Sequence, residues 1–509
     1  MLSYVRMRTQ TIPLRLGAPE TFATVRELLR RANFTEAAIC ERLGITGFHK
    51  FGSAGAHGCI GAGMSTAFDA LVRIFLDVGA VSRAVAVEVL GAAEIAAMEE
   101  LGLLCASPEN AGNVVSPVGL APTRGLWLVS DCGGDLAGLA GDVVYPAILE
   151  NTQDFLSMIP TTRCEKFLDL GAGTGVAALL AAKDFAGHAW ACDITERASV
   201  FAEFNRRLNG LENVTVDRGD LYEPVGKLQF DRIVTHPPYV PVSKPTCVFR
   251  DGGDDGEQII RRIVEGLPEY LAPGGRFYAL TLVSDRQGEA AEARVRGWLG
   301  AAEGEFDIAM IAETAREPFD FIGRAMQKGT HYPEELQYWS SVYRSLQVKY
   351  LVYGCIVVQR HAAPREAFTV RVQKGARSGA AETVWALDWN TAAAGVEPEV
   401  LLGSRLRLSP ELNLAVLHKM RGGSLAPAEF LLRVQYPFES ECKCPNWCAA
   451  LVLSCDGSRT AGEILEGLKR DGVVDQGTDA AEFAQVIRVL LGSGFLESDR
   501  LPRLPQSST

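Results

Sequence analysis

Three glycines and several acidic residues stand at the ends of apolar segments, with a spacing that could form a ligand-binding site. Gly171, Gly173 and Gly175 stand at alternate positions, directly after an apolar segment that carries Asp169. A glycine has no Cβ, so the backbone of such a loop can pass close to a ligand. A buried parallel strand that ends in a tight turn and opens a helix has this pattern. Dinucleotide enzymes use a related glycine turn, so the loop alone does not select the ligand.

Two further carboxylates follow at the ends of the next apolar segments. Asp193 ends the first of these segments, and Asp220 follows the second. A carboxylate at the tip of a strand beside a glycine loop is placed to accept hydrogen bonds from a ribose diol, which we predict for Asp193. Asp220 is placed to accept a hydrogen bond from an exocyclic adenine amine. Together with the loop, these residues predict a nucleoside-containing cofactor.

A fourth apolar segment, beginning at Phe230, runs into His236-Pro-Pro-Tyr239. Each proline fixes its own φ and disfavours helix in the residue before it, so the turn is stiff. A stiff turn at a strand end can hold a polar acceptor and a flat ring at fixed positions. A site built from these residues needs no metal.

In this order the four features resemble the class I S-adenosylmethionine-dependent methyltransferases. The chain is most similar to the amino-methyltransferases with an (Asn/Asp)-Pro-Pro-(Tyr/Phe) motif, and among these to the enzymes that methylate the glutamine amide of release factors. The stretches 219–224, 251–256 and 259–275 add to the likeness, which covers residues 140–360. The resemblance implies S-adenosyl-L-methionine as cofactor. It assigns cofactor binding to Asp169, Gly171, Gly173, Gly175, Asp193 and Asp220, and the acceptor side to His236, Pro237, Pro238 and Tyr239.

One position departs from the family pattern. The family has Asn or Asp where this chain has His236. In the family, that side chain and the carbonyl of the first proline accept hydrogen bonds from the target amine. A histidine ring offers one acceptor nitrogen, and only when it is neutral. If His236 takes over this role, activity is expected to fall below about pH 6.5, the pKa of a free imidazole.

Alternating strand and helix patterns predict a doubly wound, Rossmann-like seven-stranded domain over residues 141–360. Ligands in such sheets bind beyond the carboxyl ends of the strands, where all four features fall. We expect helices at 174–183, 195–209 and 258–271, and the last three strands at 276–283, 306–311 and 350–358. Residues 313–349 are predicted to be an insertion.

Two flanking regions lie outside this pattern. Residues 1–140 predict a mostly helical, winged-helix-like domain, with a β-ribbon formed by 114–116 and 126–130. Its role as a packing or substrate-docking unit is favoured over DNA reading because the chain is acidic. The glycine-rich stretch 52–63 is predicted to be a linker. Residues 361–509 form a C-terminal accessory domain whose last part loosely resembles the peptide-chaperone domains of peptide-modification pathways; peptide presentation and simple packing both stay open.

Composition narrows the class of protein. The 509 residues are 47 % hydrophobic and 22 % charged, with a net charge of −12. That charge disfavours a broad grip on a phosphate backbone, which needs clustered Lys and Arg. No membrane-spanning run and no signal core are seen, and the scattered cysteines suggest reduced thiols, so a cytoplasmic location is expected. The cluster Cys442, Cys444 and Cys448 leaves two readings open, free thiols or a zinc site.

The sequence therefore predicts an S-adenosylmethionine-dependent N-methyltransferase that acts on a protein side chain or peptide. Three alternatives stay open. An RNA base amine could occupy the same turn. A small molecule fits the acidic chain and the insertion. A scaffold that kept the fold and lost turnover fits the departure at His236. The oligomeric state is not predicted.

Overall fold

The computed structural model describes residues 11–48, 65–131, 141–244, 247–328 and 332–505. These divide into two compact units. The first comprises Met1–Ser157, Thr161–Val283 and Ile322–Leu346, and the second comprises Met158–Pro160, Ser284–Phe321 and Gln347–Thr509. The expected division into domains 1–140, 141–360 and 361–509 stays a prediction, and the expected linker at 52–63 lies outside the described residues.

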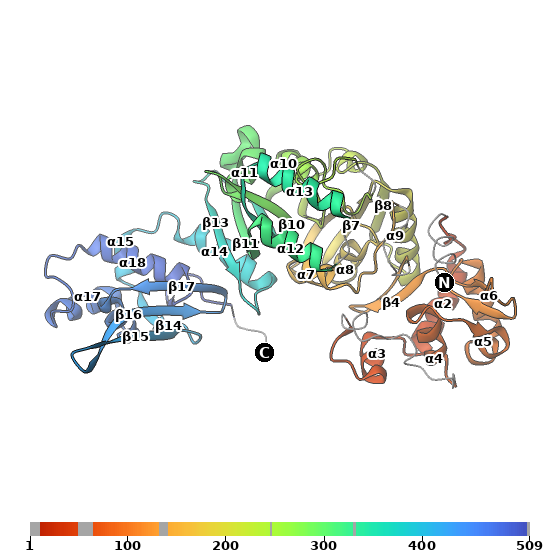
Figure 1. Ribbon diagram of the computed structural model, residues 1–509, viewed down its shortest axis with the longest axis horizontal. Helices are drawn as coiled ribbons and strands as arrows, with labels where there is room; N and C mark the ends of the chain where they lie inside the picture. The colour runs from red at the N-terminus through yellow and green to blue at the C-terminus, as the bar shows by residue number, and fades with distance from the viewer. Residues whose placement is uncertain (1–10, 49–64, 132–140, 245–246, 329–331, 506–509) are drawn as a thin grey trace. The chain divides into compact units, whose positions relative to one another are not determined.

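A parallel sheet with helices between its strands forms the centre of the first unit (Figure 1). Its strands lie in the order β10-β9-β6-β7-β8, and each neighbouring pair is parallel. This order confirms the Rossmann-like α/β fold. The bounds are β6 Cys164–Leu170, α8 Val176–Asp184, β7 Ala186–Asp193, α9 Glu196–Asn209, β8 Val214–Arg218, β9 Phe230–Thr235, α10 Gln258–Tyr270 and β10 Leu271–Arg286.

Local sequence accounts for the limits of α9, the helix after β7. The Thr195 hydroxyl oxygen accepts a hydrogen bond from the backbone N–H of Ala198, which satisfies a donor that the first turn leaves open. Gly210 follows the helix with a φ of 66°, a conformation that favours glycine and ends the helix. Both limits agree with the helix predicted at 195–209.

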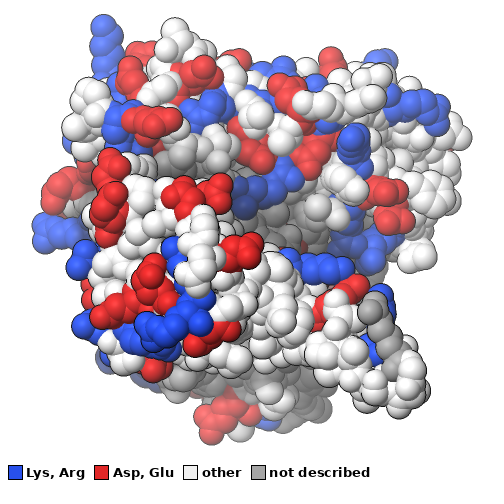
Figure 2. Space-filling view, turned by 90° about the vertical axis from the view of Figure 1, so that its left-hand side faces the viewer, with Lys and Arg blue, Asp and Glu red and all other residues white. Residues whose placement is uncertain are grey.

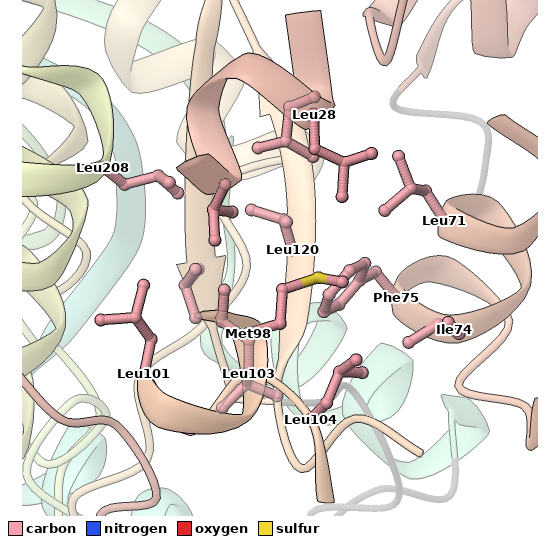
Figure 3. Close-up of a cluster of buried hydrophobic side chains, with 14 of the residues drawn as sticks. Leu28, Leu71, Ile74, Phe75, Met98, Leu101, Leu103, Leu104, Leu120 and Leu208 are labelled. Carbon is pink, nitrogen blue, oxygen red and sulfur yellow. The ribbon is translucent and has the colours of Figure 1, made fainter. Parts of the chain in front are cut away.

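The N-terminal region shares a hydrophobic core with α9. Figure 3 shows Leu208 of α9 in one cluster with Leu28 of α2 (Pro19–Arg31), Leu101 directly after α6 (Ala92–Glu100) and Leu120 of β4 (Gly119–Thr123). In the same core, the rings of Phe22 and Phe204 meet edge to face with centroids 5.0 Å apart. The elements of this region are α2 Pro19–Arg31, α3 Glu36–Leu43, α4 Ala67–Leu71, η2 Val72–Leu76, β1 Val81–Ser82, α5 Arg83–Leu90, α6 Ala92–Glu100, β2 Cys105–Ala106, β3 Asn113–Val115, β4 Gly119–Thr123 and β5 Leu126–Ser130.

The two strands of the expected β-ribbon pair with other strands and not with each other. β3 pairs with β1 and β2, whereas β5 pairs with β4. The two-residue turn Arg124–Gly125 joins β4 to β5, and both residues have positive φ, 49° and 76°. This backbone matches the twist of a tight hairpin, so β5 pairs with the strand directly before it. The prediction that 114–116 pairs with 126–130 was therefore wrong.

Two helices fill the predicted insertion at 313–349. They are α12 Pro318–Lys328 and α13 Pro333–Ser345. Pro333 is the first residue of α13, where its missing N–H costs no helical hydrogen bond. The helix that precedes β6 is α7, at Glu150–Ser157.

The second unit contains the last strands of the predicted pattern and the C-terminal region. β11 Phe306–Arg316 and β12 Val348–Arg360 pair antiparallel, and β13 Thr369–Lys374 runs parallel to β11. In the C-terminal part, β14 lies between β18 and β19, in the region predicted to be a small helical or winged unit. The remaining bounds are α11 Ala291–Trp298, η4 Gly300–Glu305, α14 Ala380–Ala393, α15 Pro398–Leu402, β14 Arg405–Leu408, β15 Asn413–Arg421, β16 Ser424–Val434, β17 Phe438–Cys444, α16 Asn446–Leu453, β18 Asp456–Thr460, α17 Ala461–Arg470, α18 Ala480–Gly492 and β19 Leu496–Ser498.

Candidate active site

The carboxyl ends of four strands meet at one edge of the sheet in the first unit. Leu170 at the end of β6 is in register with Cys192 of β7 and with Thr235 of β9. Asp193 of β7 is in register with Arg218 of β8. The Thr235 hydroxyl also donates a hydrogen bond to the Leu170 carbonyl at 2.8 Å. The residues that follow these strands, which include the glycine loop, Asp220 and His236, therefore start from the same edge.

The glycine loop has the backbone that only glycine adopts without strain. Gly171, Gly173 and Gly175 have φ values of 70°, 55° and 78°. A Cβ at Gly171 or Gly173 would meet no atom within 4 Å, whereas one at Gly175 would lie 3.1 Å from the Ala202 Cβ of α9. The first two glycines thus leave open space beside the loop. The third allows the start of α8 to approach α9.

Asp193 is held by hydrogen bonds at both carboxylate oxygens. One oxygen accepts from the Gly173 N–H at 3.0 Å, and the other accepts from the N–H and the hydroxyl of Thr195, at 3.0 and 3.2 Å. Burial raises the pKa of the Asp193 carboxyl, and these hydrogen bonds oppose the rise. The structure thus links two predicted cofactor residues, Gly173 and Asp193, directly.

Asp169 is fully enclosed beneath the loop. Its side chain is 3 % exposed and accepts a hydrogen bond from the Ala178 N–H of α8 at 3.3 Å. Burial raises the pKa of this carboxyl to about 7, and the charge on Asp193 adds to the rise. This hydrogen bond ties the end of β6 to α8, the helix that follows the glycine loop.

A backbone hydrogen bond holds the segment of Asp220 against the end of β7. The N–H of Gly219, the residue before Asp220, donates to the Asp193 carbonyl at 3.0 Å. Its carboxylate forms an ion pair with Arg262 of α10 at 2.7 Å. Both side chains are nearly half exposed, so this pair is worth little and can exchange with another donor. The adenine contact stays a prediction for Asp220.

His236 lies in a layer of rings. Its ring centroid is 5.6 Å from that of Phe155 in α7 and 6.5 Å from that of Tyr239. Among the described residues no hydrogen bond to the His236 ring is found. Burial lowers the pKa of His236 to about 4, because the charged form loses its hydration. The expectation that His236 titrates near pH 6.5 is therefore corrected: the ring is neutral over the whole physiological range.

The loop around residues 250–252 and helix α13 hold the segment that follows the His236–Tyr239 turn. The Val240 N–H donates to the Arg250 carbonyl, and the Gly252 N–H donates to the Val240 carbonyl, at 2.9 and 2.8 Å. A Cβ at Gly252 would lie 2.7 Å from the Tyr239 Cα, so only glycine allows this approach. From α13, the Trp339 Nε1–H donates to the Pro241 carbonyl at 3.0 Å. The insertion therefore supports the segment that carries Tyr239.

Three of these residues could not be identified as site residues from the sequence. No sequence pattern predicts that the Phe155 ring contacts the His236 ring. Arg262 stands in an amphipathic helix, where a basic residue commonly faces solvent. Trp339 is only 2 % exposed, and an aromatic residue in a predicted insertion does not say which segment it covers.

The chemistry of the site fits a nucleoside cofactor better than a metal. Open space beside Gly171 and Gly173, next to the oriented Asp193 carboxylate, suits a ligand that carries a sugar hydroxyl. In the part of the chain that the structure describes, no group of three or more metal-ligating side chains could hold an ion. Cys442, Cys444 and Cys448 are free cysteines, the last two buried.

A separate cavity of about 530 Å³ lies within the second unit, among β13, α14, β17 and α18. Trp385, Trp389 and Arg488 are among its lining residues. None of the predicted site residues lines it. The strand-end geometry, rather than this cavity, carries the predicted chemistry.

Comparison with known proteins places the glycine loop and the turn in one family. Residues 147–303 match the model of the "Methyltransferase small domain". A putative protein N5-glutamine methyltransferase of Methanocaldococcus jannaschii is 32 % identical over 142 residues, which are 26 % of this chain and 71 % of that protein. The chain belongs to the small-domain methyltransferase family.

Two other relatives have more specific names. A ribosomal protein uL3 glutamine methyltransferase of Bradyrhizobium diazoefficiens is 36 % identical over 30 % of this chain and 51 % of that protein. A release factor glutamine methyltransferase of Geobacter sulfurreducens is 37 % identical over 21 % of this chain and 42 % of that protein. The chain thus spans about half the length of these two relatives, which leaves their substrates a question for experiment.

The family match ends at residue 303. It covers the glycine loop, Asp193, Asp220 and the His236–Tyr239 turn. It includes neither the N-terminal helices nor the insertion helices α12 and α13. In the described part of the chain, no helix is long and apolar enough to cross a membrane.

Proposed function

We propose that this chain transfers the methyl group of S-adenosyl-L-methionine to a nitrogen atom of a protein side chain. One observation carries the proposal: the oriented Asp193 carboxylate and the His236–Tyr239 turn follow strands that end at the same edge of one sheet. A protein side chain is favoured as acceptor because the relatives are named for ribosomal protein uL3 and release factor substrates. Such substrates also favour a cytoplasmic location.

The bound cofactor would supply an activated methyl group. The residues of the chain would hold the cofactor and the target nitrogen in alignment. The glycine loop lets the backbone approach the cofactor, and Asp193 would accept a hydrogen bond from its sugar. Alignment of a nucleophile with the reacting carbon can lower a barrier by roughly 7–11 kcal/mol in favourable cases. The target nitrogen gives up one proton when it gains the methyl group, so the acceptors of its hydrogens would have to pass that proton to water.

On the acceptor side, the neutral His236 ring offers one nitrogen that can accept a hydrogen bond from the target amine. The Pro237 carbonyl is the second acceptor that the family resemblance assigns to this turn. The Tyr239 ring lies nearly parallel to the His236 ring, at an interplanar angle of 26°. A flat amide group can stack on such a ring while its nitrogen meets the two acceptors.

The test is transfer of a labelled methyl group from S-adenosyl-L-methionine into a fractionated lysate, with the intact chain as enzyme. Label is expected in protein, and hydrolysis of the labelled protein should give a methylated glutamine or another N-methylated residue. Purified release factor and ribosomal protein uL3 are the first defined substrates to try. An Asp193→Ala variant serves as the matched blank.

Other outcomes select the other functions. Label in RNA alone would favour base methylation, although basic and acidic side chains are interspersed on the face drawn in Figure 2 and offer a phosphate backbone no uniform basic surface there. Label in low-mass compounds alone would favour a small-molecule acceptor. Cofactor binding without transfer to any fraction would favour a scaffold.

A further inference from the structure

Two asparagines of α9, one helical turn apart, pair with the backbone of β5. The Asn205 side chain accepts from the Val129 N–H at 2.7 Å and donates to the Val129 carbonyl at 3.0 Å. The Asn209 side chain accepts from the Trp127 N–H at 2.9 Å and donates to the Trp127 carbonyl at 2.8 Å. The two amides therefore satisfy alternate residues of one strand.

This arrangement replaces a neighbouring strand. β5 pairs with β4 on one side, and successive residues of a strand point their backbone groups to opposite sides. Trp127 and Val129 direct theirs away from β4, toward α9. Without Asn205 the Val129 N–H and carbonyl would be buried without these partners, which is unfavourable, whereas the Trp127 groups bonded to Asn209 are only partly buried. The pair thus fixes the β4–β5 hairpin to the helix that follows β7.

Asn205 differs from Asn209 in its second donated hydrogen bond. The Asn205 amide also donates to the carbonyl of Thr174, at 3.0 Å, and Thr174 belongs to the glycine loop. The Asn209 amide donates instead to the Asn205 backbone carbonyl at 2.8 Å, within α9. Asn205 is 0 % exposed, so its amide has no water to replace either partner. Of these two asparagines, Asn205 is the one that connects the hairpin to the loop.

The orientation of the Asn205 amide is determined by its partners. Two carbonyls, of Val129 and Thr174, face its nitrogen, and one N–H faces its oxygen. A reversed amide would bring its oxygen against both carbonyls. The loop meets α9 at a second point, where a Cβ at Gly175 would lie 3.1 Å from the Ala202 Cβ, so α9 contacts the loop at both Thr174 and Gly175.

We propose that Asn205 is a positioning residue of the cofactor site, which couples docking of the β4–β5 hairpin to cofactor binding. The proposal rests on the proposed function, because the ligand is S-adenosyl-L-methionine. A cofactor that orders the glycine loop stabilises the Thr174 contact and, through Asn205, the contact to Val129. Coupling of this kind is reciprocal, so the cofactor strengthens hairpin docking and the docked hairpin strengthens cofactor binding.

The experiment compares Asn205→Ala with Asn209→Ala in the full chain. Both variants remove a side chain that pairs with β5, and both are expected to lower the melting temperature. Calorimetric titration with S-adenosyl-L-methionine should show a dissociation constant raised about tenfold in Asn205→Ala, as expected for loss of a buried hydrogen bond, and changed less than about threefold in Asn209→Ala. Equal changes in the two variants would overturn the proposal.

Hydrogen exchange gives a second readout, and its first comparison, with and without cofactor, needs only the wild-type chain. In the wild-type chain, cofactor should slow exchange of the amides of Trp127 and Val129, and in Asn205→Ala this protection should vanish while the loop stays protected. If the cofactor binds the wild-type chain and leaves these two amides unchanged, the coupling is absent. If it does not bind the wild-type chain at all, the proposed function itself has failed, which is a distinguishable result.

Discussion

At the predicted cofactor end of the site, hydrogen bonds and charge hold the side chains, whereas at the acceptor end ring contacts hold them. Asp193 accepts hydrogen bonds from two backbone N–H groups and a hydroxyl. The His236 ring is near the rings of Phe155 and Tyr239 and receives no hydrogen bond from the described residues. The two ends are built by different interactions on the same sheet edge.

The difference suggests how far each end tolerates change. A hydrogen bond weakens steeply when its angle or length changes, so few side chains can replace Asp193. A ring that contacts other rings is held mainly by packing, which other flat side chains can provide. This offers a physical account of a histidine standing where the family has Asn or Asp.

The sharpest test of the comparison is Asp193→Ala. The change removes the acceptor of the Gly173 and Thr195 N–H groups and the predicted partner of the cofactor sugar. We expect affinity for S-adenosyl-L-methionine, measured by calorimetry, to fall about 100-fold, since several hydrogen bonds are lost together.

Asp231→Ala is the matched control for this test. Asp231 also accepts from two backbone N–H groups, those of Glu165 and Lys166, but it stands near the start of β9. The control should lower stability and leave cofactor affinity unchanged. Equal loss of affinity in both variants would mean that Asp193 acts only through folding.

The acceptor end is tested by His236→Ala and His236→Asn. The alanine variant should lower the methyl-transfer rate about 100-fold through misplacement of the acceptor. Cofactor affinity should stay within about threefold, since no hydrogen bond to the cofactor end is lost. The asparagine variant should keep more of the rate, because its amide oxygen can accept from the target amine. If His236→Ala lowered cofactor affinity as much as the transfer rate, the cofactor end and the acceptor end of the site would not be functionally distinct.

A smaller effect is expected from Asp169→Asn, measured without cofactor by urea unfolding between about pH 4 and pH 8. The folded pKa of Asp169 is raised to about 7 from 3.8. Between these values the folded state holds a proton that the unfolded state has lost, so the wild-type chain loses stability as pH rises through this window. The Asp169→Asn variant lacks this loss. As pH rises through the window, its free energy of unfolding should therefore increase relative to that of the wild-type chain. A difference that does not change with pH would contradict the burial of the carboxyl.

The smallest expected effect is in the pH profile of the transfer rate. Because the pKa of His236 is lowered to about 4, the ring stays neutral as pH falls from 8.5 to 5.5, and its contribution to the rate should not change in that interval. Initial rates at saturating cofactor and acceptor measure this directly. A decline centred near the free imidazole value of about 6.5 would show that the ring is more hydrated than the structure indicates.

Much of the sheet could be predicted because its signals are local. The apolar segment before Gly171, the acidic strand tip at Asp193 and the prolines after His236 each specify strand ends through neighbouring residues. The helix at 195–209 was predicted with both limits because Thr195 and Gly210 define them through backbone geometry. The ribbon prediction failed at the point where pairing depends on a turn, since Arg124–Gly125 joins β5 to β4 instead.

By itself, the sequence determined the order of strands and helices, the glycine loop and the acidic strand tips, because these depend on residues close together along the chain. Only the tertiary structure decided that Asn205 joins Val129 to Thr174, that Phe155 contacts the His236 ring, and that burial lowers the pKa of His236. Those contacts join residues 31 to 81 positions apart, as with Asn205 and Thr174 at 31. Which distant surfaces meet, and how much water they exclude, is set by packing of the whole unit, so no local pattern could have specified them.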